Sequence, residues 1–323
     1  MQTACAEAAM VIASPSTVLR DMAGFARGVE GGIYYYIIAI ALYFGSSLLW
    51  GVRWWLILRR LGDHVSYWDA YTAIMGGILF NNITPSLKMG GETFRAAWVW
   101  LTDRVPLDRT ILSIFYERLT EVPGVSLVAI IAVSSGLIDI VHASHPLLAF
   151  ASTVTMGLGL GWIRDLWRDV RERVSTDARV LVRDVKLTSV SVTIGVLIWL
   201  QDITRFYLIG RAVGLNLSLG EASILSISYL VLGMTPTPAG VGFVEGGLTS
   251  ILLAMGYPLD KIALLVVGER LISSVMSSLV GLVLIRTRGG AKMLREASRI
   301  ARSMKGGVQA DGITADSTSV RLV

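Results

Sequence analysis

Long apolar runs alternate along the chain with short polar segments that hold most of its charge. An α-helix needs about 20 predominantly apolar residues to cross a hydrocarbon core about 30 Å thick. Five runs meet this requirement, and they predict spanning helices over 33–58, 111–133, 145–163, 187–209 and 262–285. The pattern therefore predicts an all-α polytopic membrane protein.

Two further apolar segments, 70–100 and 222–255, are interrupted by prolines and glycines. Proline costs about 3 kcal/mol in a helix interior and glycine about 1 kcal/mol, so each segment predicts a broken helix and not a continuous span. Irregular backbone is tolerated at membrane depth only where protein or a water-filled cavity surrounds it. The two breaks therefore predict a cavity within the protein.

Basic residues gather in three segments, 53–60, 164–186 and 286–323, whereas 134–144 contains none. Lysine and arginine in short loops favour the cytoplasmic side, so we expect all three basic segments there, in a protein of the cell membrane. All three basic segments can lie in the cytoplasm only if each interrupted segment enters and leaves the membrane on the same side. The charge pattern thus predicts two re-entrant helix pairs.

An internal repeat links the two halves of the chain. Residues 106–119 recur at 258–271, 152 positions later, with seven of fourteen residues identical. The first block precedes a span that leaves the cytoplasm and the second a span that returns to it, so the repeats are predicted to be inverted. Inverted repeats with broken helices place a substrate site near the midplane, between the halves.

The repeat defines the predicted domain organisation. Residues 1–32 form a tail or an interfacial helix, 33–285 form the transmembrane domain, and 286–323 form a basic cytoplasmic tail. Within the transmembrane domain, repeat one covers 33–133, a connector covers 134–186, and repeat two covers 187–285.

Charged residues also occur inside the predicted spans, where each costs about 2.5–3.5 kcal/mol on insertion scales and usually faces a cavity or another charge. A helix that restarts after a break exposes N–H donors and a partial positive charge, and arginine suits phosphate because its planar fork donates two hydrogen bonds. These features predict a site for an anionic headgroup. The predicted substrate-binding residues are Asn82, Glu92, Arg95, Glu117, Arg118, Asp202, Arg205, Glu245, Glu269 and Arg270.

Structural roles compete with this interpretation. Glu117-Arg118 and Glu269-Arg270 would also serve to hold the halves together, and Glu92 and Glu245 would also serve as caps of restarted helices.

Composition narrows the chemistry further. The chain is 53% apolar and 16% charged, which excludes a soluble enzyme and a nucleic-acid-binding module. Its single cysteine and three histidines near span ends provide no disulfide and no metal-ligand cluster, so we expect no metal and no cofactor.

Several motifs together resemble the transmembrane-region family of lysylphosphatidylglycerol synthase, which is also described as flippase-like. The resemblance covers about 33–285, and the motifs that carry it are Arg53-Trp54, Asn82-x-x-Pro85, Gly91-Glu92-x-x-Arg95, Glu117-Arg118, Pro236-x-Pro238-Ala-Gly240-x-Gly242-x-x-Glu245 and Glu269-Arg270-Leu271. It implies a membrane domain that translocates lipid. In larger relatives, this domain flips aminoacylated phosphatidylglycerol made by a soluble C-terminal aminoacyltransferase domain.

Only 38 residues follow Ile285, too few for such a transferase domain, so we expect no synthase activity and no enzyme. The first hypothesis is a flippase for an anionic, phosphate-bearing lipid, either a membrane phospholipid or a polyprenyl-phosphate-linked lipid. The second is a proton-coupled transporter of a small anion, and the third is a membrane-embedded transferase. No nucleic-acid partner is expected, and a homo-oligomer is compatible with the sequence.

Overall fold

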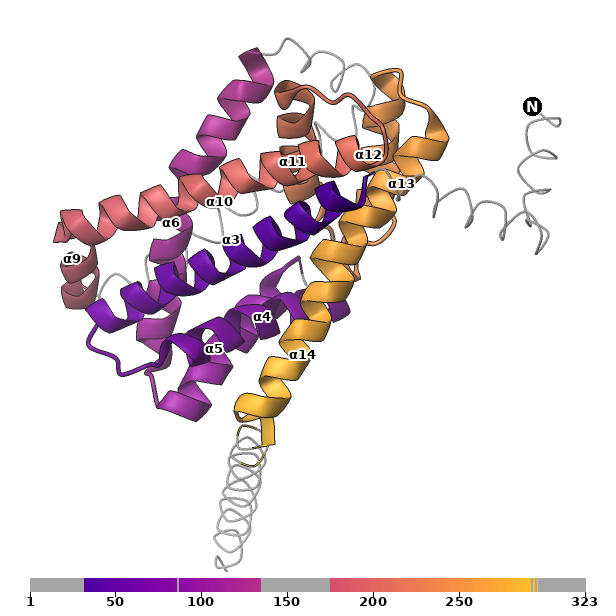
Figure 1. Cartoon of the computed structure of the whole chain (residues 1–323). Coiled ribbons are helices and arrows are strands. Elements are labelled where there is room, and N and C mark those ends of the chain that lie inside the picture. Colours follow the sequence, from indigo (N-terminus) through magenta and orange to yellow (C-terminus); the bar gives the residue numbers. More distant parts are fainter. Residues whose placement is uncertain (1–31, 86, 135–174, 292, 294, 296–323) are drawn as a thin grey trace, which may run out of the picture.

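The computed structural model describes residues 32–85, 87–134, 175–291, 293 and 295, and every element in this part of the chain is helical (Figure 1). The predicted span 145–163 and most of the predicted connector and tails lie outside the described residues. The all-α class that the apolar pattern predicts is confirmed for the described residues.

Three described helices are long and apolar enough to cross a membrane, namely α3 (Ile33–Arg60), α10 (Val185–Ala212) and the helical stretch Leu259–Arg288. They correspond to the first, fourth and fifth predicted spans, each extended by two or three residues at one or both ends. The predicted span 111–133 lies in α6 (Leu107–Ser134), which has the length but is not among the three. Each stretch of α6 long enough to span contains three charged residues, Glu117, Arg118 and Glu121.

The helix Leu259–Arg288 is not uniform. It begins as α13 (Leu259–Arg270), continues as a π-helical turn η2 (Leu271–Met276), and ends as α14 (Ser277–Arg288). π-helical turns are rare and occur frequently at functional sites.

Both interrupted segments are broken helices, as the prolines and glycines predict. In the first half, α4 (Tyr67–Ile83) and α5 (Met89–Asp103) flank the break. In the second half, α11 (Leu219–Leu232) and α12 (Phe243–Ala254) flank a short turn, η1 (Pro238–Gly240).

The helices α4 and α5 lie side by side and antiparallel. A Cβ on Gly76 would clash with the Phe94 ring, and the Gly91 amide donates to Asn81 Oδ1 at 2.7 Å. At about 1.5 Å per residue, neither helix reaches across a bilayer alone.

The offset of 152 positions, evident in the sequence only at 106–119, extends through the helix bounds. The helix α10 begins and ends 152 positions after α3, and α11 begins 152 positions after α4. Their N-cap serines, Ser66 and Ser218, are equivalent too.

The breaks share the same offset. Leu87 and Lys88 have left-handed backbone, as do Ala239 and Gly240, which lie 152 positions later. Left-handed conformations in residues other than glycine cost about 1–3 kcal/mol and cluster at functional sites.

The equivalent helices α3 and α10 run in opposite directions. At one end, a Cβ on Gly32 would lie 2.3 Å from the carbonyl oxygen of Ala212. At the other end, Arg60 Nε binds Asp184 Oδ2 at 2.5 Å. Figure 1 shows α3 and α10 side by side along their length.

The open end of a helix pair is the end at which the chain enters and leaves it. The open ends of the two pairs lie at opposite ends of α3. The residues flanking the α4–α5 pair meet near Arg60, where Arg109 Nη1 lies 3.3 Å from Asp63 Oδ1. Burial raises the pKa of Asp63, and the charge of Arg109 opposes that rise. The residues flanking the α11–α12 pair meet at the other end, where Lys261 Nζ donates to the Gly214 carbonyl oxygen at 2.9 Å.

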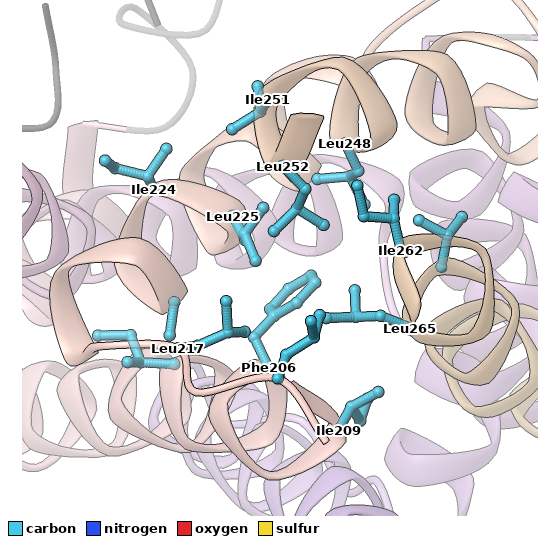
Figure 2. Close-up of a cluster of buried hydrophobic side chains, with 14 of the residues drawn as sticks. Phe206, Ile209, Leu217, Ile224, Leu225, Leu248, Ile251, Leu252, Ile262 and Leu265 are labelled. Atoms are coloured by element: carbon cyan, nitrogen blue, oxygen red, sulfur yellow. The ribbon is translucent and has the colours of Figure 1, made fainter. Parts of the chain in front are cut away.

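Two apolar cores hold the helices, and the larger one also contains buried side chains of α3 and α6 from the first half. Trp54, Trp98 and Phe94 lie in the core formed by α3, α4 and α5. The larger core lies between α10, α11, α12 and α13, and Figure 2 shows its side chains around Phe206. Trp54 and Phe206 are equivalent in the repeat and are both fully buried. The two cores fix the helices that carry the charged side chains described next.

The remaining element, α9 (Ser175–Arg183), lies beside the start of α10 (Figure 1). Its Asp177 accepts a hydrogen bond from Arg109 Nε at 3.1 Å, which ties α9 to the start of α6.

Candidate functional site

A buried carboxylate on α6 is the centre of the first charge network. Glu117 is 0% exposed, and its Oε2 accepts a hydrogen bond from Arg95 Nη2 at 2.6 Å. Its Oε1 accepts from Trp50 Nε1 and from Arg53 Nη2, the latter at 3.4 Å. Both oxygens of Glu117 are therefore occupied by donors from three residues on two other helices.

Arg118 extends this network toward the break of the first half. Its Nη2 binds Glu92 Oε1 in the first turn of α5, and its Nη1 binds Glu121 Oε2 at 2.8 Å. The Arg118 side chain remains 44% exposed, although it lies on a helix among other charged groups. It is the most accessible arginine of the network.

Aromatic rings lie against two of the guanidinium groups of this network, those of Arg95 and Arg118. Arg95 lies over the Trp54 ring with 4.3 Å from Cζ to the ring centroid, and Arg118 lies 5.7 Å from the Trp50 centroid. Such contacts stabilise a cation where water is excluded. They explain how the arginines are held inside apolar helices.

The second network contains a different arrangement around the equivalent carboxylate. Glu269 is 0% exposed, and Arg205 Nη1 lies 3.1 Å from its Oε1. The same guanidinium binds Asp202 Oδ1 through Nη2 at 2.5 Å. Here one arginine is shared between two carboxylates.

Arg270 in the second half occupies the position of Arg118 in the first. Its Nε binds Glu245 Oε1 at 2.7 Å, and its Nη1 donates to the carbonyl oxygen of Ala239 in the break at 2.8 Å. Glu245 also caps α12, because its Oε2 accepts from the Gly242 amide at 2.7 Å. The capping role and the ion-pair role that the sequence left as alternatives are thus combined in Glu245.

The equivalences run through both networks. Arg53 and Arg205 differ by 152 positions, as do Glu117 and Glu269, and each arginine lies beside the equivalent glutamate. Arg118 and Arg270 also differ by 152 positions, and each binds a glutamate in the first turn of the restarted helix, Glu92 in α5 and Glu245 in α12, which lie 153 positions apart. The sequence repeat identified the glutamates and the Glu-Arg-Leu motif, whereas the role of Arg53 was missed.

Lys88 is the second residue that sequence reasoning missed, and it lies between the networks. Its Nζ lies 5.9 Å from the centroid of the Tyr229 ring on α11. A Cβ on Gly233 would lie 2.9 Å from this Nζ, so the end of the Lys88 side chain packs closely against the Gly233 backbone. Four charged groups act on Lys88 electrostatically, and they come from both halves: Arg118, Asp202, Glu121 and Arg270.

Within the described part of the chain, Lys88 has no carboxylate within 4.0 Å and no hydrogen-bond partner. Its position directly before Met89-Gly90-Gly91, inside the broken segment, was the available sequence signal. A lysine at a helix restart is unusual because the restarted N-terminus already has a partial positive charge.

The two asparagines before the first break connect elements. Asn81 Oδ1 accepts a hydrogen bond from the Gly91 amide and so pairs one of the backbone N–H groups in the first turn of α5. Asn82 Nδ2 donates to Ser278 Oγ at 2.9 Å and to the Ser274 carbonyl oxygen at 3.2 Å. Asn82, predicted as a substrate-binding residue, joins the first half to η2 and α14.

The structure thus places all ten predicted site residues in two networks or at the contact between the halves. Among the described residues, no group of three His, Cys, Asp or Glu side chains is placed to hold a metal ion. That these ten residues bind substrate stays a prediction.

Comparison with known proteins gives a family. Residues 8–281 match the family described as "Lysylphosphatidylglycerol synthase TM region". A "UPF0104 membrane protein" of Methanothermobacter thermautotrophicus is 24% identical over 78% of this chain and 84% of its own length. The "UPF0104 membrane protein PH1989" of Pyrococcus horikoshii is 22% identical over 83% of this chain and 92% of its own length. No solved structure matches the chain.

Proposed function

Because the chain belongs to the lysylphosphatidylglycerol synthase TM region family, we propose that it is a lipid translocase. It moves an anionic, phosphate-bearing lipid between the two leaflets, along a path at the contact between the halves. The family description names a lipid synthase, which supports a lipid substrate, and the apolar helices support a membrane location.

The observation that carries this proposal is the position of Lys88. The other charged side chains of the two networks each have an oppositely charged partner within 4.0 Å. A phosphate that reaches Lys88 gains a cation without breaking an ion pair. It then lies close to the charges of Arg118 and Arg270, which act on Lys88.

Arginine forks explain how the phosphate is held and released. Arg118 and Arg270 can exchange Glu92 and Glu245 for phosphate oxygens, because both carboxylates lie on restarted helices at the break. When the lipid leaves, the glutamates take the arginines back. This competition limits how tightly the anion binds.

The proposed architecture is a pair of inverted repeats, each with a re-entrant helix pair. Three observations support it: the offset of 152 positions, the opposite directions of α3 and α10, and the opposite ends at which the helix pairs open. Repeats of this type carry a substrate site at their interface. We place the basic end of α14 in the cytoplasm of a cell membrane, by the positive-inside rule.

A proton-coupled transporter of a small anion is the second candidate, and the environment of Glu269 favours it. Neither oxygen of Glu269 receives a hydrogen bond of normal geometry from the described residues. The proposal treats the chain as a translocase and not as an enzyme.

Reconstitution into liposomes tests the proposed function. The protein is placed in vesicles that contain fluorescent phosphatidylglycerol, a short polyprenyl phosphate or zwitterionic phosphatidylcholine, and arrival of each lipid in the opposite leaflet is measured. We expect faster movement of one or both anionic lipids than in protein-free vesicles, and little change for phosphatidylcholine. Uptake of radioactive inorganic phosphate by the same vesicles separates the lipid from the small-anion candidate.

The matched variants are Lys88→Gln and Lys261→Gln. Hydrogen bonds to charged groups contribute about 1.5–3 kcal/mol, so loss of Lys88 should slow anionic lipid movement about ten- to a hundredfold. Lys261 contacts the Gly214 carbonyl far from the networks, and its variant should move lipid normally. Equal rates for wild type and Lys88→Gln, or equal rates for anionic and zwitterionic lipids, contradict the proposal.

A further inference from the structure

Glu269 is a fully buried carboxylate with few stabilising contacts. Its side chain is 0% exposed, and among the described residues neither Oε1 nor Oε2 receives a hydrogen bond of normal geometry. Among the residues that the structure describes, its one ion-pair partner is Arg205, with 3.1 Å between Nη1 and Oε1. A buried carboxylate without hydrogen bonds is unfavourable in its charged form, and protonation relieves that cost.

The equivalent residue Glu117 differs in what its protonation would require. Arg95, Arg53 and Trp50 all donate to Glu117, and a neutral carboxyl would leave two buried guanidinium groups with only longer ion pairs, Arg53 to Glu121 at 3.8 Å and Arg95 to Glu92 at 3.5 Å. Protonation of Glu269 disturbs its network less, because Arg205 keeps its ion pair with Asp202 through Nη2. The network around Glu269 therefore tolerates both protonation states.

The groups that face Glu269 come from each helix packed around it. Arg205 and Asp202 belong to α10, Tyr43 to α3 and Tyr229 to α11, while Arg270 is its neighbour on α13. Ser273, on η2, lies beside the carboxylate and accepts from the Tyr229 hydroxyl at 2.9 Å. On the sides of α3 and α11, Glu269 thus faces the hydroxyl groups of Tyr43 and Tyr229 and no further carboxylate of the described residues.

The local backbone also changes directly after Glu269. The π-helical turn η2 begins at Leu271 and ends at Met276, whereas the equivalent part of α6 is α-helical. Its Ser273 is the equivalent of Glu121, so the second half lacks the third glutamate of the first. The backbone and the side chains both distinguish this position from its copy.

We propose that Glu269 is a reversible proton-binding site, and that it binds one proton for each phosphate monoanion the protein translocates. Glu269 takes the proton from water as a carboxylate, becomes a neutral carboxyl, and returns the proton to water when the anion leaves. No other bond forms or breaks. The coupling to the anion rests on the proposed function, whereas proton binding by Glu269 does not.

Charge balance gives the ratio of one proton to one anion. The two networks together contain six cations, Arg53, Arg95, Arg118, Arg205, Arg270 and Lys88. They contain six carboxylates, Glu92, Glu117, Glu121, Asp202, Glu245 and Glu269. Protonation of Glu269 makes the site positive by one charge, and a phosphate monoanion restores neutrality. Net charge is costly at membrane depth, so the proton and the anion favour each other's binding.

Infrared difference spectroscopy during a pH titration tests proton binding directly, without any transported substrate. We expect the wild-type protein in detergent to gain and lose the carbonyl-stretching band of a neutral carboxyl as pH is changed. Glu269→Gln should lack this component, whereas Glu221→Gln should keep it, because Glu221 caps α11 outside the networks. Persistence of the component in a folded Glu269→Gln protein overturns the inference.

A second variant keeps the test decisive if Glu269→Gln fails to fold. In Asp202→Asn, Glu269 is the one carboxylate of the described residues that still pairs with Arg205, so the charged form of Glu269 is favoured. The carboxyl band should then titrate at lower pH than in wild type. An unchanged titration in Asp202→Asn contradicts the inference.

The coupling is measured in the liposomes described above, with a pH gradient imposed across the membrane. Wild-type lipid movement should accelerate when the gradient drives protons in the direction of lipid movement, and Glu269→Gln should lose this dependence. If the infrared component is present but wild type moves no lipid, the proposed function fails and proton binding by Glu269 stands. If wild type moves lipid without dependence on the gradient, the coupling is wrong.

Discussion

Glu117 and Glu269 stand at equivalent positions in the two halves, within the same Glu-Arg-Leu motif, yet their surroundings differ. Glu117 accepts from three residues, while Glu269 lies beside one arginine that Asp202 also binds. The difference comes from the facing helix, where Trp50 in the first half corresponds to Asp202 in the second. A duplicated motif therefore has one copy suited to holding helices together and one suited to changing charge.

The comparison of the halves requires that they have opposite orientations, and cysteine labelling tests this with an all-or-none result. In a Cys5→Ser background, exposed residues at equivalent positions are replaced one at a time, namely His64, Asp108, Asn216 and Asp260. We expect His64→Cys and Asp108→Cys to react with a membrane-impermeant reagent from one side. Asn216→Cys and Asp260→Cys should react from the other side, because the helix pairs open at opposite ends of α3.

Permeabilised membranes supply the control, since all four cysteines should react there. Labelling of His64→Cys and Asp108→Cys from different sides would show that the α4–α5 segment crosses the membrane. Labelling of all four from one side would exclude inverted repeats.

Unequal stability losses at the two glutamates form the next largest expected effect. Removal of one partner from a buried ion pair costs about 3–5 kcal/mol when it leaves a charge without compensation. Glu117→Ala should approach this amount, because it removes the shortest ion pair of both Arg53 and Arg95 and leaves them the longer pairs with Glu121 at 3.8 Å and Glu92 at 3.5 Å. Glu269→Ala should lose less, because Arg205 keeps Asp202.

Thermal unfolding of the two purified variants in the same detergent provides the measurement. Glu221→Ala, outside the networks, serves as the control for loss of a glutamate from a helix. Equal losses at Glu117 and Glu269 would remove the distinction between the two copies.

Much of the fold followed from local sequence features. The apolar runs predicted α3 and α10 to within three residues at each end, and the prolines and glycines located both helix breaks. These predictions worked because the apolar length of a spanning helix and the helix-breaking effect of proline depend on the segment itself.

The partners within the site could not be predicted in the same way. Glu117 meets Arg53 from α3 and Arg95 from α5, and such contacts depend on how the helices pack. Lys88 was passed over because its significance lies in its distance from carboxylates on other helices and in its contact with Tyr229 of the other half. The offset of 152 positions relates Arg53 to Arg205 in the sequence. Only the structure shows that each of these arginines contacts the equivalent glutamate.

The helix caps should show the smallest effect, and here the two halves should agree. Ser66 Oγ accepts from the Asp69 amide at 3.1 Å, and Ser218 Oγ accepts from the Glu221 amide at 3.2 Å, so the two hydroxyls have the same role. Replacement of an N-cap serine by alanine costs about 1 kcal/mol. We expect Ser66→Ala and Ser218→Ala each to lower stability by about this amount in thermal unfolding, and the double variant to lose the sum, because the caps lie at opposite ends of α3. A loss at one serine several times that at the other would show that the halves diverge in their helix starts as well as around their buried glutamates.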